Sequence, residues 1–179
     1  MRLMLATCMF VLASFTPASA ADETVELDGM KSKVPAEWKQ EQPSNSMRVY
    51  QMKLPKAEGD DSAPELVVFF FKAGSGSIEA NLKRQEAKFE AAEGKKLDVK
   101  VEKTKVGKID ATYQDIKGTF LSKFPPFDPN AKTTRKADHR QIYVIFEGKT
   151  GQYYVTLLGS NKSVEKNKAA FDGFLKGFE

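Results

Sequence analysis

The single histidine of the chain is the first residue that could do chemistry. His139 follows Asp138 and precedes Arg140, and an imidazole beside a carboxylate can act as a general base. The sequence marks no nucleophile to partner it, because the Gly-x-Ser-x-Gly pattern of hydrolases is absent. The residues therefore favour a structural or exposed histidine, and we expect the protein not to be an enzyme.

Two further segments contain residue types that bind ions. Glu58, Asp60 and Asp61 offer the hard oxygen atoms that calcium prefers, but they lack the spacing and closing glutamate of an EF-hand. The Gly-Ser-Gly-Ser segment at 74–77 precedes an expected helix, whose free amides could bind phosphate, but the Walker lysine is missing. We predict a solvated acidic loop and an ordinary helix cap at Ser77, with no metal and no cofactor.

The segment Phe124-Pro125-Pro126-Phe127-Asp128-Pro129-Asn130 is the best candidate for a functional surface. Its prolines exclude a regular strand or helix, so we expect 122–138 to be irregular. We predict that Phe124, Pro125, Pro126 and Phe127 form a stiff apolar patch that binds a protein partner. The alternative is that the rings lie over the sheet and only anchor the loop.

Lysines concentrate just before this loop, on a predicted hairpin and its approach: Lys95, Lys96, Lys100, Lys103, Lys105 and Lys108. Lys103 and Lys105 could flank the phenylalanine loop and speed association with an acidic partner. The alternative is that neighbouring acidic residues dilute the charge, and that the lysines protect an edge strand from aggregation.

The first twenty residues predict a signal peptide. Arg2 precedes an apolar run over 3–15, and Pro-Ala-Ser-Ala at 17–20 is the small-residue pattern after which signal peptidase cuts. We expect cleavage after Ala20 and export of a single domain, 21–179, to the periplasm of a Gram-negative host or the exterior. In the alternative, the segment before Cys8 is a lipobox and Cys8 is lipidated.

The composition of the exported part excludes several functions. Cys8 is the only cysteine, so the mature chain would have no disulfide and no cysteine ligand for zinc. Lys and Arg total 28 against 24 acidic residues in the whole chain, and without Arg2 the excess is three, which does not indicate nucleic-acid binding. No later segment is long and apolar enough to span a membrane, and we expect a monomer that binds an unknown protein partner.

Apolar periodicity predicts seven strands and two helices. The strands are expected at 24–27, 47–54, 66–71, 99–105, 109–120, 140–146 and 153–158. The helices are expected at 77–92 and 164–178, the second capped by Ser163. Short connections favour antiparallel neighbours, which predicts an α+β fold with a mainly antiparallel central sheet and a helix on each face. The expected core contains Phe69, Phe71, Phe89, Val144, Leu157, Phe171 and Leu175.

Three segments resemble the Mog1/PsbP-like fold family. Val34-Pro35-Ala36-Glu37-Trp38 is similar to its opening Pro-x-x-Trp turn, and 151–159 with the helix at 164–178 resembles its last strand and helix. The segments 127–130 and 143–159 are also similar to uncharacterised exported proteins of Planctomycetes. The family implies an α/β/α sandwich that binds other proteins without catalysis, and no residue role is carried over. A small-ligand or lipid carrier of the cell envelope is the alternative function, and an enzyme ranks below it.

Overall fold

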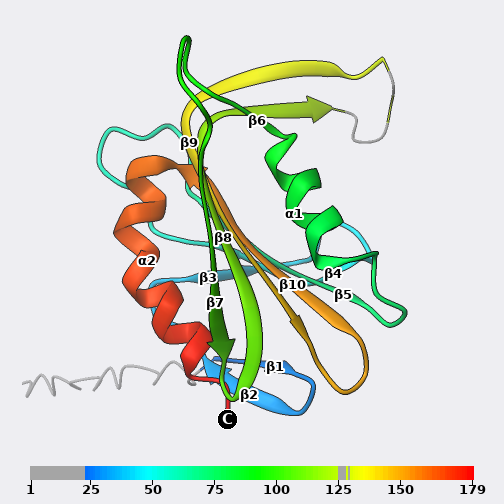
Figure 1. The fold of residues 1–179 in the computed structure, drawn as a ribbon. Coiled ribbons are helices and arrows are strands. Elements are labelled where there is room, and N and C mark those ends of the chain that lie inside the picture. Colours follow the sequence, from blue (N-terminus) through cyan, green and yellow to red (C-terminus); the bar gives the residue numbers. More distant parts are fainter. Residues whose placement is uncertain (1–22, 125–127, 129) are drawn as a thin grey trace, which may run out of the picture.

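A large antiparallel sheet and two helices make up the computed structural model, which describes residues 23–124, 128 and 130–179 (Figure 1). The eight-stranded sheet has the order β3-β4-β5-β10-β9-β8-β6, and β7 also pairs with β8. Its strands are β3 (Lys39–Glu41), β4 (Arg48–Lys53), β5 (Glu65–Phe71), β6 (Phe89–Glu90), β7 (Asp98–Val106), β8 (Ile109–Phe124), β9 (Lys132–Glu147) and β10 (Gln152–Ser160). A separate hairpin joins β1 (Thr24–Leu27) and β2 (Met30–Lys33). The predicted α+β class and antiparallel sheet are confirmed.

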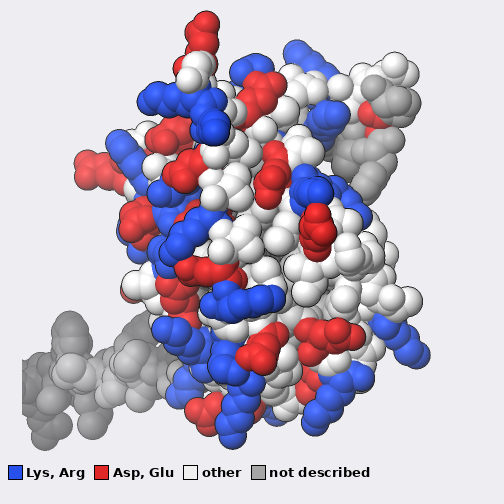
Figure 2. All heavy atoms as spheres, in the orientation of Figure 1, with Lys and Arg blue, Asp and Glu red and all other residues white. Residues whose placement is uncertain are grey.

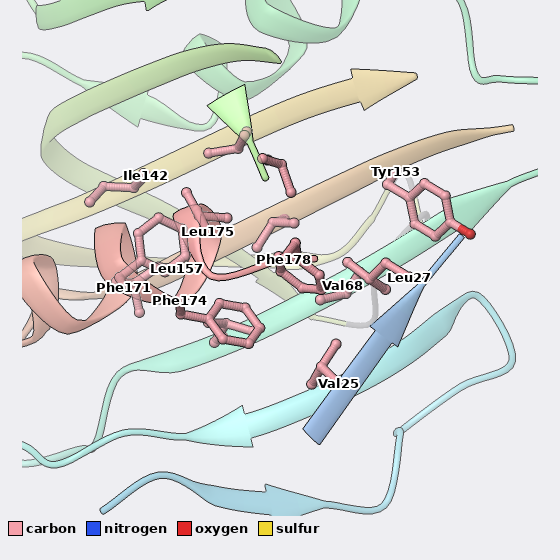
Figure 3. Packing of buried hydrophobic residues seen from close by; sticks show 14 of the residues in the cluster. Val25, Leu27, Val68, Ile142, Tyr153, Leu157, Phe171, Phe174, Leu175 and Phe178 are labelled. Atoms are coloured by element: carbon pink, nitrogen blue, oxygen red, sulfur yellow. The ribbon is translucent and has the colours of Figure 1, made fainter. Parts of the chain in front are cut away.

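The larger core lies between the sheet and helix α2 (Asn161–Lys176). Figure 3 shows Phe171, Phe174 and Leu175 of α2 packed with residues of the sheet and of β1. Trp38 packs on Phe174 with ring centroids 5.4 Å apart. Of the seven residues expected in the core, five are buried, whereas Phe69 and Phe71 are half-buried.

A smaller cluster lies beside helix α1 (Ile78–Glu86). Tyr143 and Ile145 of β9 pack there with Leu82, whereas their neighbours Ile142 and Val144 belong to the cluster of α2. We call the surface of the sheet that carries Tyr143 and Ile145 the α1 face. Successive residues of a strand point to opposite faces, which explains why β9 serves both clusters.

Helix α1 is shorter than the sequence predicted. Ser77 caps it as expected, its hydroxyl accepting a hydrogen bond from the Ala80 amide at 3.2 Å, but the helix ends at Glu86 instead of continuing to residue 92. Phe89 instead begins β6 and pairs with Phe120 of β8, and the two rings lie 5.3 Å apart. The apolar spacing of the segment fits a helix, but tertiary strand pairing decides its last turn.

The expectation that 122–138 is irregular was wrong for most of that segment. β8 continues to Phe124 and β9 begins at Lys132, so the two strands form a long hairpin. The register shifts between Gly118 and Phe120, opposite Asp138 with its positive φ of 48°, and the hairpin bends over the end of α1 (Figure 1). We call the part beyond this bulge, 119–124 and 132–138, the arm. Polar Thr and Lys side chains on the arm concealed its strands from the apolar pattern.

Helix α2 begins one turn earlier than predicted. Ser160 is the N-cap, and its hydroxyl accepts a hydrogen bond from the Ser163 amide at 3.1 Å. Ser163, expected to be the cap, lies inside the first turn, and its hydroxyl donates to Asp60. Both serines fit the cap preference equally well, so residue type alone does not tell which one caps.

Candidate protein-binding surface

Phe124 is the most exposed large apolar residue among those described. It ends β8, pairs with Lys132 of β9, and 77% of its surface is exposed. Phe124 thus lies on the surface, as the predicted contact patch requires. Pro125, Pro126 and Phe127, the other members of that patch, lie outside the described residues.

The base of the arm is held by aromatic contacts. Phe120 packs between Phe89, at 5.3 Å, and the ring of His139, which stacks on it at 6.3 Å with an interplanar angle of 12°. The amide of Leu121 donates to the Lys88 carbonyl at 2.8 Å, which joins the arm to the segment after α1. These contacts position the strand that carries Phe124.

The structure does not bring Lys103 and Lys105 beside the phenylalanine loop. They pair with Thr112 and Asp110, at the opposite end of β8 from Phe124. Thr112 precedes Phe124 by twelve residues, about 40 Å of extended chain. The expectation that these lysines flank the loop was therefore wrong, because β7 runs away from the arm.

Most charges on the β7–β8 hairpin are paired locally. Lys105 contacts Asp110 at 2.5 Å, Lys100 contacts Glu102 at 2.5 Å, and the hydrogen bond from Lys105 lowers the pKa of Asp110. Lys103 differs, since among the described residues its ammonium donates to the Thr112 hydroxyl at 3.2 Å and meets no carboxylate. Figure 2 shows both signs of charge interspersed over this side of the molecule rather than one patch of a single sign.

An open groove of about 520 Å³ lies on the α1 face, next to Ile78 at the start of α1. Ile78 and Ile145 supply apolar surface, whereas Lys103, Asp110 and Glu147 place charges on its lining. This mixture differs from the enclosed, largely apolar cavity that a lipid carrier presents.

His139 has no catalytic partner among the described residues. Its Nδ1 lies 2.9 Å from the Ala137 carbonyl, and no carboxylate forms a hydrogen bond with the ring. Ser160 faces it across β9 and β10, but the Ser160 hydroxyl donates to Asp60 instead of to the imidazole. A general base acting on a nucleophile needs that missing contact.

The acidic loop has a structural contact that the sequence did not indicate. The Asp60 carboxylate accepts hydrogen bonds from the hydroxyls of Ser160 and Ser163, and these bonds lower its pKa. A carboxylate at the start of a helix also interacts favourably with the helix dipole. In the part of the chain that the structure describes, no three His, Cys, Asp or Glu residues gather as metal ligands.

A solved structure with the same architecture is the solution structure of cyanobacterial PsbP (CyanoP) from Synechocystis sp. PCC 6803. The two chains are 12% identical and superpose with a TM-score of 0.52, over 94% of this chain and 98% of the other. The fold is Mog1/PsbP-like. No protein-family profile and no curated protein matches the sequence, so the likeness concerns the fold alone.

This Mog1/PsbP-like domain contains a polar layer under α1 that sequence reasoning missed. Asn81 and Gln85 of the helix are buried, and so are Gln114 and Gln141 of the sheet. Gln114 donates to the Leu82 carbonyl at 3.3 Å and Gln141 donates to Gln85 at 3.2 Å. Asn81 and Gln85 are four residues apart and therefore lie on one side of the helix. Polar side chains at that spacing usually indicate a side that faces water, which is why the sequence did not predict a buried layer.

Each described helix of the domain is too short or too polar to cross a membrane.

Proposed function

We propose that this Mog1/PsbP-like protein is an exported, non-catalytic protein-binding module that contacts its partner with the end of the arm. The observation that carries the proposal is the exposure of Phe124, 77%, at the end of a strand held by packed aromatic rings. Burial of one phenylalanine side chain contributes about 1.5–3 kcal/mol, enough to anchor an interface. A side chain on a strand that is already ordered also loses less entropy on binding.

The charges of the arm favour an acidic partner surface. Lys123, Lys132 and Lys136 are exposed, and among the described residues none of them forms an ion pair. Arg135 is the exception, since it pairs with Glu90. Lys123 and Lys132 lie beside Phe124 and Lys136 lies further along the arm, so the three ammonium groups would steer an acidic surface toward the arm.

We propose that the domain that carries the arm is an α/β/α sandwich. Leu82 of α1 packs with Tyr143 and Ile145, whereas α2 packs with the alternate residues Ile142 and Val144. Layers on both sides of β9 would hold the base of the arm rigid.

The test is crosslinking of the full-length protein in its native cell envelope, followed by capture. Phe124→Ser should abolish recovery of the crosslinked partner while leaving the melting temperature unchanged, because the side chain packs little in the monomer. Met47→Ser is the matched control, since Met47 is 42% exposed and lies on the strand-β4 side of the sheet, away from the arm. Equal loss in both variants, or normal capture by Phe124→Ser, would refute the proposal.

Export has its own test, because residues 1–22 lie outside the described part of the chain. N-terminal sequencing of protein recovered from the envelope should begin at Ala21. An intact Met1, or a lipidated Cys8, would contradict the predicted signal peptide.

A small-ligand or lipid carrier is the second candidate, and the volume of the groove on the α1 face favours it, whereas the charges on its lining do not. Its volume of about 520 Å³ lies within the range of small-molecule sites. Titration with a fluorescent fatty acid separates the two functions, since a carrier should bind it stoichiometrically and Ile145→Lys should prevent binding. The binding module should show no saturable uptake.

A further inference from the structure

Strand β7 forms a long and regular open edge of the sheet. It pairs with β8 over nine consecutive residue pairs without a register shift, whereas β4–β5 and β8–β9 both contain one. Among the described residues, β8 is the one strand that pairs with it. Natural proteins protect such edges with short strands, bulges, proline or charged side chains, and of these devices β7 has only its charged side chains. The other edge strands, β3 and β6, have only three and two residues.

The hairpin geometry indicates which groups point outward. Gly107 and Lys108 form a two-residue turn between Val106 and Ile109. In such a turn the flanking residues, Val106 and Ile109, form a backbone hydrogen-bonded pair. Hydrogen-bonded and outward-pointing residues alternate along an antiparallel strand. Counting back from Val106, the backbone groups that point to the open edge belong to Val99, Val101, Lys103 and Lys105.

The side chains of these four residues share the α1 face. Lys103 pairs with Thr112, which pairs with Ile145, and Val101 is in register with Gln114 and Tyr143. Val101 is 49% exposed, and Lys103 has no carboxylate partner among the described residues. The open edge therefore presents two valines and then Lys103 and Lys105, of which Lys105 also pairs with Asp110, next to backbone groups that bond to no other strand among the described residues.

We propose that β7 binds an extended acidic segment of another protein as an additional strand of the sheet. Main-chain hydrogen bonds supply the affinity of such an addition, and alternate side chains supply its selectivity. An antiparallel strand would place acidic residues beside Lys103 and Lys105, and apolar residues beside Val99 and Val101. The edge of β7 is separate from the arm. This proposal rests on the proposed function in one respect only, namely that the ligand is a protein.

The probe is the capped peptide Glu-Thr-Glu-Thr-Val-Thr-Val, compared with Lys-Thr-Lys-Thr-Val-Thr-Val. Fluorescence anisotropy should show binding of the glutamate peptide alone, weakened about five- to tenfold by the double variant Lys103→Glu/Lys105→Glu. The control variant Lys39→Glu/Lys72→Glu carries the same charge change at exposed positions away from β7 and should bind as the wild type does. Melting temperatures confirm that each variant is folded.

Hydrogen exchange locates the peptide. The amides of Val99, Val101, Lys103 and Lys105 should gain protection when the glutamate peptide is added. No binding, equal binding of both peptides, or protection confined to the groove or the arm would overturn the proposal. Sedimentation that shows a dimer excluding the peptide would overturn it as well, because a second copy of the chain would then occupy β7. The Phe124→Ser test is independent of all these outcomes, so either proposal can fail alone.

Discussion

Removal of the buried Arg140 guanidinium should destabilise the domain strongly. Its Nε lies 2.8 Å from Asp115 Oδ1 and its Nη2 lies 2.6 Å from Asp115 Oδ2, both on the sheet. Its Nη1 also donates to Glu165, which ties the sheet to α2. Only 4% of the Arg140 side chain and 12% of the Asp115 side chain are exposed, whereas Glu165 is 68% exposed. The hydrogen bonds that Arg140 donates to Asp115 raise the pKa of Arg140, which keeps it charged.

The loss of unfolding free energy depends on whether the charged partner left behind is buried or exposed. Arg140→Met leaves the Asp115 carboxylate without its cation in a nearly closed site, a change that costs about 3–5 kcal/mol. Glu165→Gln should cost less than about 1 kcal/mol, because an exposed partner regains water. The double variant Arg140→Met/Asp115→Leu removes both buried charges and should recover at least half of the loss.

Equilibrium unfolding in urea, followed by tryptophan fluorescence, measures these free energies. The chain has one tryptophan, Trp38, which packs on Phe174 of α2 and therefore reports the packing of that helix. The reasoning is refuted if Arg140→Met costs less than Glu165→Gln, or if the double variant is less stable than Arg140→Met alone.

Three further predictions concern the core, one turn and the start of α2. Phe171→Ala should cost about 3–5 kcal/mol in urea unfolding, since Phe171 is fully buried, and a small shift of the midpoint would contradict this packing. Gly107→Ala should destabilise more than Gly94→Ala: both have positive φ, but only at Gly107 would a Cβ lie 2.1 Å from a backbone oxygen. Asp60→Asn should be less stable than the wild type at neutral pH. Because folding lowers the Asp60 pKa, this difference should vanish as pH falls below the ordinary value near 3.8, and a constant difference down to pH 2 would exclude the carboxylate as its cause.

The local sequence pattern was sufficient to predict the elements whose structure depends mainly on their own residues. The apolar run of β5, the alternation in β7, and the Ser77 cap of α1 are all as expected. The order of elements also predicted the antiparallel sheet and the Mog1/PsbP-like fold. Such features depend on periodicity and capping, which act over a few residues.

Contacts between distant segments decided the rest. Phe89 leaves the helical pattern because Phe120, thirty-one residues later, offers it a strand partner. At the start of α2, Ser160 and Ser163 both donate to Asp60, which lies one hundred residues before Ser160 in the chain.

The candidate surfaces show the same division. The sequence by itself determined which residue types stand where: Phe124, the lysines of 95–108 and the single histidine, His139. Only the tertiary structure decided that Phe124 and Lys103 lie at opposite ends of β8, that β7 is an open edge, and that amides are buried under α1. Strand order and register bring together residues far apart in the chain, and no local periodicity encodes that order.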